Sequence, residues 1–217
     1  MAVKQWFEVD RKGLEALMRR RAGDQGGGEL GLAFMMFELL QNAYDEEVTE
    51  VHAALQATDR RGRASLCVLD DSPDGFRDLR DSWTLFKPSY KASNPTKRGR
   101  FNLGEKLVLA LCESAQIVST CGGVSFDDKG RHTLRRNRDA GTEFTAVVKI
   151  TNKDVERIDS AMKLLIPAVP TTYNGLPLAM PEPLAETEGI ALPTEYADEE
   201  GSLHRTTRQT TIEIYEP

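Results

Sequence analysis

Apolar residues fill most of segment 32–44, and only Glu38, Gln41 and Asn42 interrupt them. In a helix, Glu38, Asn42 and Asp45 would share one face, because they are spaced i, i+4 and i+7. An ordinary surface helix carries a broader polar face than this. The pattern therefore predicts a largely buried helix whose narrow polar stripe faces a concave site for a polar ligand. The alternative is an amphipathic helix with its polar face in solvent.

The rest of the hydrophobic pattern predicts further helices and strands. Asp10, Asn102 and Asn152 are suited to cap three of the helices. Two strands between helices, followed by consecutive strands, predict an α/β (α+β) fold. We expect a two-layer sandwich, with a mixed and mostly antiparallel sheet covered on one face by helices. The expected helices are 11–21, 103–113 and 154–165, and the expected strands are 48–57, 64–69, 116–120, 124–127, 131–136 and 143–150.

The chain changes character after residue 166, because six of its ten prolines fall between Pro167 and Pro193. We expect one domain at 1–166 and an extended or irregular segment at 167–217. That segment ends in a strand rich in β-branched residues at 205–215. A domain rarely ends on a strand without packing, so the segment is interpreted as the start of a junction with a further domain.

Composition places the chain among ordinary globular proteins. It has 217 residues, of which 40% are hydrophobic and 29% charged. No apolar run approaches the roughly 20 residues of a membrane helix, and the N-terminus lacks the apolar core of a secretion signal. We therefore expect no membrane partner and a cytoplasmic location. Cys67, Cys112 and Cys121 lack metal-site spacing and are expected to be buried free thiols.

The net charge of −6 gives no reason to expect nucleic acid as a partner. Its distribution is more informative, because the window 87–106 holds six basic residues and one acid, Glu105. A solvated basic loop is the ordinary interpretation of such a window. Concentration of the bases in one glycine-containing stretch of an acidic protein favours an anion site, with phosphate as the natural candidate.

Three segments carry candidate chemistry when they are read in order. They are Glu-Leu-Leu-Gln-Asn-Ala-Tyr-Asp at 38–45, Val-Leu-Asp-Asp-Ser-Pro-Asp-Gly-Phe at 68–76 and Gly-Arg-Phe-Asn-Leu-Gly-Glu-Lys at 99–106. In this order they resemble the GHKL ATP-binding domain, or Bergerat fold, of gyrase B, the ninety-kilodalton heat-shock chaperones, histidine kinases and MutL. That family has Glu-x-x-x-Asn-x-x-Asp on a helix, then Asp-x-Gly-x-Gly, then a Gly-x-x-Gly-x-Gly lid. The resemblance spans about 14–150.

The resemblance implies divided roles along the helix at 32–44. The amide oxygen of Asn42 suits Mg²⁺, a hard cation whose octahedron the triphosphate and waters would complete. Glu38 would orient or deprotonate the water that attacks the γ-phosphate. Asp45 would support the site through water or a hydrogen bond, or would simply end the helix. A surface carboxylate is the alternative for Glu38.

Asp70 ends an apolar strand and is suited to accept a hydrogen bond from the exocyclic amine of adenine. The resemblance implies that Thr142 assists at the same edge and that Gly75 belongs to the turn beneath the base. This second motif departs from the family pattern. Ser72 stands where the first glycine is expected, and one extra residue precedes Gly75. The turn is therefore expected to have a different shape.

The third motif looks like a phosphate lid that leads into a helix. Its glycines allow backbone N–H groups to approach phosphates, and the helix presents its N-terminus to them. Asn102 replaces the middle glycine, which asparagine tolerates. Lys87, in a segment similar to the chaperones' lid-proximal segment, is a further candidate phosphate ligand. The candidate nucleotide-binding residues here are Gly99, Arg100, Phe101, Asn102, Leu103, Gly104, Glu105 and Lys106.

The resemblance implies an N-terminal module that binds Mg-ATP, closes its lid and hydrolyses ATP slowly. Self-association on ATP binding, or through further domains, is the implied partnership. A histidine or serine kinase of the same fold is an alternative, although no histidine lies in a suitable dimerisation helix. A nucleotide-gated binding module without turnover is another, since many relatives take a lysine from a following domain. The amino-acid sequence of the lid is also similar to that of phage ATP-binding proteins related to the rII A protein.

Overall fold

Most of the expected helices and strands are present. The computed structural model describes residues 10–24, 28–85, 103–198 and 202–216. The helices are α1 (Arg11–Asp24), η1 (Gly28–Ala33, 3-10), α2 (Phe34–Tyr44), η2 (Leu79–Ser82, 3-10), α3 (Gly104–Leu111) and α4 (Asn152–Met162). The strands are β1 (Val51–Ala57), β2 (Ala64–Asp70), β3 (Cys112–Ser119), β4 (Gly122–Asp127), β5 (Gly130–Leu134), β6 (Glu143–Val148), β7 (Thr171–Tyr173), β8 (Leu176–Pro177), β9 (Ala185–Ala197) and β10 (Leu203–Ile214).

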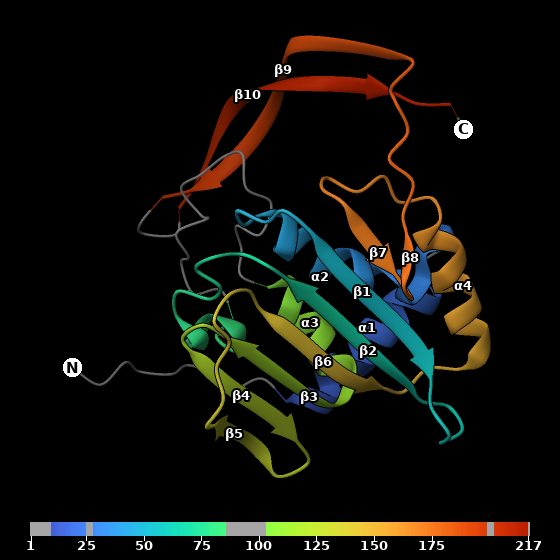
Figure 1. Cartoon of the computed structure of the whole chain (residues 1–217), viewed down its shortest axis with the longest axis vertical. Coiled ribbons are helices and arrows are strands. Elements are labelled where there is room, and N and C mark those ends of the chain that lie inside the picture. Colours follow the sequence, from blue (N-terminus) through green and yellow to red (C-terminus); the bar gives the residue numbers. More distant parts are fainter. Residues whose placement is uncertain (1–9, 25–27, 86–102, 199–201, 217) are drawn as a thin grey trace.

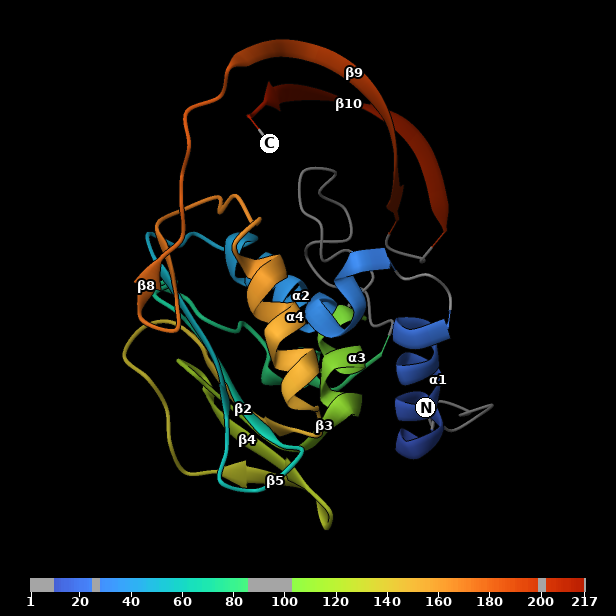
Figure 2. The same cartoon turned by 90° about the vertical axis from the view of Figure 1, so that its right-hand side faces the viewer.

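Eight strands form the main sheet, in the order β5-β4-β3-β6-β2-β1-β7-β8 (Figure 1). Neighbouring strands are antiparallel, except that β1 and β7 are parallel. The helices lie on one face of this sheet (Figure 2). The expected two-layer sandwich with a mixed, mostly antiparallel sheet is therefore confirmed. No helix within the described ranges is long and apolar enough to cross a bilayer.

Helix α2 lies in the core, against the sheet and the neighbouring helices. It packs against α3, β1 and β2. Met35, Met36 and Leu40 are at most 1% exposed. Each such side chain contributes roughly 1.5–3 kcal/mol through burial. The prediction of a largely buried helix at 32–44 is confirmed, although the α-helix itself begins at Phe34.

Helix caps agree with the sequence in one case and differ in another. Asp10 Oδ1 accepts a hydrogen bond of 2.7 Å from the Gly13 N–H, as expected for the cap of α1. The predicted cap of α4 was wrong, because Thr151 fills that position instead of Asn152. Thr151 Oγ1 accepts from the Asp154 N–H at 3.2 Å, and Asp154 Oδ2 accepts from the Thr151 N–H at 2.9 Å. This reciprocal capping box satisfies two N–H groups at the helix start.

Two other expectations need correction. Strand β3 begins at Cys112, directly after α3, and not at 116 as the sequence suggested. The segment Gln116–Thr120 held the stronger apolar pattern, but pairing with β6 begins at Cys112. Cys121 is exposed, so it is not a buried thiol, whereas Cys112 is buried. Burial raises the pKa of the Cys112 thiol to about 12.

The segment after residue 166 is more regular than expected. Strands β7 and β8, which follow residue 166, extend the main sheet beside β1. Strands β9 and β10 then form a separate two-stranded sheet, and this hairpin arches over the helices, clear of the main sheet (Figures 1 and 2). The sequence predicted only the second of its strands. The junction with a further domain stays a prediction.

Candidate functional site

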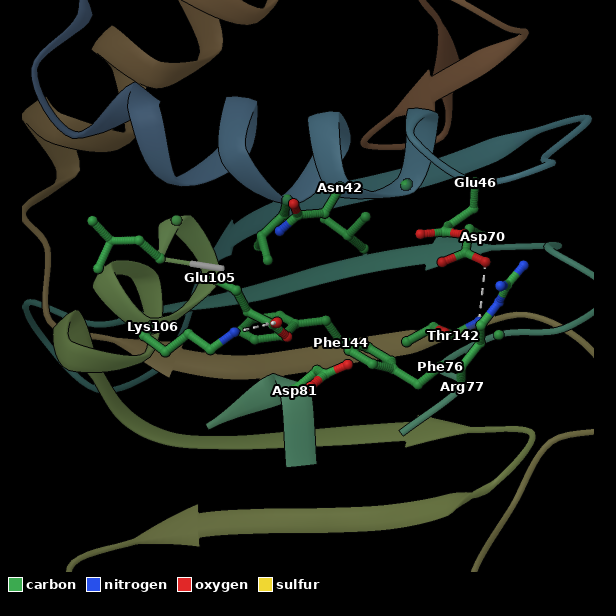
Figure 3. A pocket seen from close by; sticks show the side chains of 16 residues that line it. Asn42, Glu46, Asp70, Phe76, Arg77, Asp81, Glu105, Lys106, Thr142 and Phe144 are labelled. Atoms are coloured by element: carbon green, nitrogen blue, oxygen red, sulfur yellow. Dashed lines mark hydrogen bonds and ion pairs between the residues drawn. The ribbon is translucent and has the colours of Figure 1, made fainter. Parts of the chain in front are cut away.

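A pocket opens between α2, the start of α3, strands β2 and β6, and the loop that follows β2. It encloses about 930 Å³, including solvent at its mouth. Figure 3 shows Asp70, Glu46 and Arg77 at one end and Glu105 and Lys106 toward the other. Ligand pockets commonly combine an apolar lining with a few polar groups in this way. The pocket is lined by Leu39, Asn42, Ala43, Glu46, Val68, Asp70, Gly75, Phe76, Arg77, Asp81, Leu103, Gly104, Glu105, Lys106, Thr142 and Phe144.

Asp70, the last residue of β2, is held firmly at one end of the pocket. Its Oδ1 accepts hydrogen bonds from the backbone N–H groups of Ser72, at 3.0 Å, and Thr142, at 3.1 Å. Burial raises the pKa of the Asp70 carboxyl, while these two backbone bonds act in the opposite direction. The carboxylates of Glu46 and Asp71 raise it further. Because both backbone bonds use Oδ1, Oδ2 is the oxygen that can accept from a ligand.

A buried serine connects the turn after Asp70 to Thr142. Ser119 is 0% exposed. Its Oγ accepts from the Phe76 N–H at 2.7 Å and lies 3.0 Å from Thr142 Oγ1. The Thr142 carbonyl in turn accepts from the Asp70 N–H at 3.0 Å. Ser119 therefore fixes both the turn and the threonine hydroxyl, and sequence reasoning missed it.

Beneath the pocket, two positions require glycine because neighbouring atoms leave no room for a Cβ. Gly75 has φ of +59°, and a Cβ there would overlap Ser119 Oγ. Gly141 has φ of +75°, and a Cβ there would overlap the carbonyl of Asp70. Both backbone conformations also disfavour residues other than glycine.

The departure from the family's second motif has a local structural reason. Ser72 is 2% exposed. Its N–H donates to Asp70, and its carbonyl accepts a 2.7 Å bond from the Gly141 N–H. The backbone of Ser72 thus ties the turn to Asp70 and to the Gly141–Thr142 segment. A serine in place of the first glycine is compatible with the pocket.

The polar residues of α2 do not all face the pocket. Asn42 lines it, and so does Glu46, which lies just beyond the C-terminal end of α2. Glu38 is half-buried and is not among the lining residues; its carboxylate contacts Gly104, where a Cβ would overlap Oε2. Burial raises the pKa of Glu38. Asp45 is 8% exposed, occupies the C-cap of α2 and is also not among the lining residues.

The first turn of α3 brings a buried pair of opposite charges to the pocket. Lys106 is 6% exposed and Glu105 is 8% exposed. Lys106 Nζ lies 3.7 Å from Glu105 Oε2. Leu103 and Gly104 line the pocket just before them. Burying a charged group is costly unless the group has partners. An anionic ligand in the pocket could take the place of Glu105 as the partner of Lys106.

The structure gathers most of the predicted residues and adds others. Asn42, Asp70, Gly75, Leu103, Gly104, Glu105, Lys106 and Thr142 line one pocket. Sequence reasoning missed Glu46, Arg77 and Asp81 as lining residues. Glu46 follows the end of α2, and Arg77 and Asp81 follow the second motif, so no recognisable pattern marks these three residues. Of the other predicted residues, Glu38 and Asp45 do not line the pocket, and Lys87, Gly99, Arg100, Phe101 and Asn102 lie outside the described residues.

Asn42 supplies the pocket with an oxygen donor for a metal ion. Within the described ranges, no group of three or more histidine, cysteine, aspartate or glutamate side chains could hold a metal ion. The amide oxygen of Asn42 is the type of hard donor that Mg²⁺ accepts. Mg²⁺ commonly takes one or two protein ligands and completes its shell with phosphate and water. Asn42 therefore fits an ion that arrives with a phosphate ligand.

Comparison with known proteins reveals a likeness to a solved structure. No protein-family model matches the sequence, and no curated protein matches it. Among solved structures, the chain is similar to the ATPase region of Saccharomyces cerevisiae topoisomerase II, with a TM-score of 0.51 and 13% sequence identity. The match covers 68% of this chain and 49% of that chain. At this identity the likeness establishes a shared fold.

Proposed function

The chain has the GHKL-type ATP-binding fold, and on that premise we propose that it binds Mg-ATP in this pocket and hydrolyses it slowly to ADP and phosphate. The observation that carries the proposal is the geometry of Asp70. Two backbone N–H groups hold one of its carboxylate oxygens, and the residue lines the pocket. A fixed acceptor of this kind suits a ligand with an amino group.

Adenine is the base that fits this acceptor. Its exocyclic amine can donate to Asp70 Oδ2, whereas guanine presents a carbonyl at the corresponding position. Thr142, whose hydroxyl Ser119 orients at 3.0 Å, would assist at the same edge of the base. Phe76 and Phe144 supply apolar surface for the ring.

The other end of the pocket fits the phosphates. Lys106 is the buried cation there, and an incoming phosphate would compete with Glu105 for it. The backbone of Gly104 and the start of α3 can approach phosphate oxygens closely. Asn42 would hold Mg²⁺, which when bound neutralises part of the triphosphate charge.

Glu38 is the proposed general base for hydrolysis. Its raised pKa makes the carboxylate a better proton acceptor than an exposed glutamate. In the structure described here its carboxylate rests against Gly104, so it would turn toward the water that attacks the γ-phosphate. The proton of that water would pass to Glu38 as the bond to ADP breaks.

Two further parts of the proposal come from the sequence resemblance alone. Closure of the basic lid at 99–104 over the phosphates is one, and Lys87 and Arg100 are its candidate cations. Self-association on ATP binding is the other. Most of the lid lies outside the described residues.

A binding experiment tests the adenine contact. Asp70→Asn keeps an oxygen for the two backbone N–H groups but turns an amide N–H₂ toward the donor on adenine. We expect ATP affinity, measured by calorimetry, to fall roughly 10- to 100-fold. Asp71→Asn is the matched control, because Asp71 bonds to Thr49 and Glu50 and is not a lining residue. Equal ATP affinity in the Asp70 variant and the wild type would refute the assignment.

A turnover experiment tests Glu38. Glu38→Ala should abolish release of phosphate from ATP and retain ATP binding. Unchanged turnover in this variant would remove Glu38 from the mechanism. Transfer of radiolabelled γ-phosphate to protein would instead favour a kinase of this fold, and binding without turnover would favour a nucleotide-gated binding module.

A further inference from the structure

The hairpin of β9 and β10 is long, and among the described elements no other helix or strand packs extensively against it. Its strands have 13 and 12 residues and form their own sheet. In both views it arches clear of the eight-stranded sheet (Figures 1 and 2). An isolated two-stranded hairpin is at best marginally stable in water, and a third strand usually provides the missing stability. The two outer edges of the hairpin differ in their capacity to accept such a strand.

Strand β9 is protected against pairing at its outer edge. Pro193 cannot donate a backbone hydrogen bond and is found essentially on edge strands. Glu188 and Gly189 together face the single residue Thr211, which makes a bulge on β9, and Gly189 has φ of +71°. Bulges, prolines and charged side chains are the usual devices that keep an edge from pairing. The charges on this strand are the glutamates Glu186, Glu188 and Glu195.

Strand β10 carries charged side chains but has neither a proline nor a bulge. Its sequence, Leu-His-Arg-Thr-Thr-Arg-Gln-Thr-Thr-Ile-Glu-Ile, contains no proline, glycine or lysine. Half of its residues are β-branched threonine or isoleucine, which favour strands. It runs regularly past the bulge on β9. Within the described ranges, β9 is the one strand paired with it. The hairpin can therefore accept a third strand at β10 and not at β9.

The sequence of β10 is complementary to itself in an antiparallel arrangement. If a two-fold axis passes through Gln209, Arg205 of one copy lies directly opposite Glu213 of the other. The same register sets Thr207 opposite Thr211, two β-branched residues. Residues directly opposite each other share a face of the sheet, so the Arg205–Glu213 pair can form twice, once on each side of the axis. Arg205 is 91% exposed and already meets Glu195 at 3.2 Å on its other side.

We propose that β10 pairs with β10 of a second copy of this chain, antiparallel and centred on Gln209. The product is a four-stranded sheet, β9-β10-β10-β9, whose two outer edges are both protected. An antiparallel strand pair has two-fold symmetry, which is the commonest symmetry of protein dimers. Pairing would also cover Ile212 and Ile214, which are 40% and 57% exposed. This dimer contact lies in the hairpin and needs no nucleotide.

Charge reversal tests the register. The full chain, without nucleotide, should be a dimer at micromolar concentration by light scattering and sedimentation. Arg205→Glu or Glu213→Arg should each weaken the dimer roughly tenfold or more, because each change sets like charges opposite each other twice per dimer. The double variant Arg205→Glu/Glu213→Arg should restore the dimer. Arg208→Glu is the matched control, since it changes the net charge equally and lies opposite Thr210.

Cross-linking tests the two-fold axis independently. In a Cys121→Ser background, Gln209→Cys places two thiols opposite each other, within reach of a disulfide. Oxidation should yield a covalent dimer. Ala191→Cys is the control, because Ala191 is the partner of Gln209 on β9 and lies away from the axis. It should stay monomeric on a denaturing gel.

Several results would overturn the proposal. They are a monomeric wild-type chain, a dimer that charge reversal leaves unchanged, a double variant that fails to recover, and equal cross-linking at positions 191 and 209. Calorimetry with ATP on the Arg205→Glu variant separates this proposal from the proposed function. Retained ATP binding by a monomeric variant would show that the hairpin contact and the nucleotide site are independent.

Discussion

At the scale of single residues, the site is built from side chains whose surroundings leave little freedom. Asp70 has one oxygen fixed by two backbone N–H groups. Glu38 rests against a glycine that has no room for a methyl group. In both residues burial disfavours the charged form and raises the pKa. The cost of keeping these carboxylates ionised should therefore appear in measurements of stability.

The pH dependence of stability is expected to reveal Asp70. Its folded pKa lies above the ordinary value of 3.8, so ionisation is harder in the folded protein than in the unfolded chain. The wild type should therefore lose stability relative to Asp70→Asn as pH rises from 3.8 through the raised pKa. Urea unfolding of both proteins across this range measures the difference. A constant difference, or a wild type that gains stability relative to Asp70→Asn as pH rises, would contradict the expected desolvation.

Gly104 should be sensitive to a single methyl group because of Glu38. Gly104→Ala forces the Glu38 carboxylate aside and is expected to cost about 1–3 kcal/mol in the free energy of unfolding. Gly13→Ala is the matched control, because Gly13 also lies in a first helical turn and a Cβ there meets its nearest atom at an ordinary 3.5 Å. That change should be neutral or stabilise by up to about 1 kcal/mol.

A double-mutant cycle isolates the contact between Gly104 and Glu38. In a Glu38→Ala background the clash is absent, so the cost of Gly104→Ala should largely disappear. Denaturant unfolding of the four proteins gives the coupling free energy. The same cost in both backgrounds would mean that Glu38 does not rest against Gly104.

Residues of the site could be predicted when their signal was local. Asn42 follows from helical spacing, and Asp70 from its place at the end of an apolar strand. Ser119, by contrast, reaches the site from β3 because that strand runs beside β6 in the sheet. No sequence pattern near Ser119 indicates that β3 lies beside β6. Arg77 lies in the loop after β2 and Asp81 in the short 3-10 helix η2, whose path tertiary packing decides.

At the scale of elements, the strongly periodic segments were predictable and the boundaries were not. Helix α2 and strands β1, β2 and β6 follow clear apolar patterns. Strand β9 was missed because Gly189, Pro193 and its glutamates all have low strand propensity. It is a strand because β10 pairs with it along its length. The glycine, proline and glutamates of β9 are therefore features of a protected edge strand and do not indicate a loop.

The capping box of α4 gives a prediction at this scale. Thr151→Ala removes the side chain that accepts from the Asp154 N–H and should cost about 1 kcal/mol in the free energy of unfolding. Asn152→Ala, one residue later, is the control and should cost much less. Thermal or urea unfolding of both variants decides the matter. A larger loss of stability in Asn152→Ala than in Thr151→Ala would show that Asn152 is the cap.

At the scale of the whole molecule, the body and the hairpin should behave as separate units. A chain that ends at Pro183 lacks β9 and β10 but keeps the eight-stranded sheet. We expect it to unfold cooperatively with the midpoint of the full chain. Circular dichroism with thermal or urea unfolding provides the comparison. A large loss of stability would mean that the hairpin supports the body.

A shorter chain that ends at Leu165 should fail to fold stably. It loses β7, which pairs with β1 in the main sheet. The Val51 N–H then lacks the Pro170 carbonyl, and the Leu55 N–H lacks Asn174 Oδ1. Unpaired buried backbone groups cost about 1–3 kcal/mol each. Cooperative unfolding of this short chain at the midpoint of the full chain would show that β7 is dispensable.

The parallel pairing of β1 with β7 also has a consequence for how the protein is made. Val51 and Thr171 are partners, so β1 leaves the ribosome about 120 residues before the strand that covers its edge. At about 5–20 residues per second, this delay is roughly 6–24 s. During that time β1 presents an open strand edge to neighbouring nascent chains. Slow translation of the stretch between β1 and β7 is therefore expected to increase co-translational aggregation, even when the finished protein is unchanged.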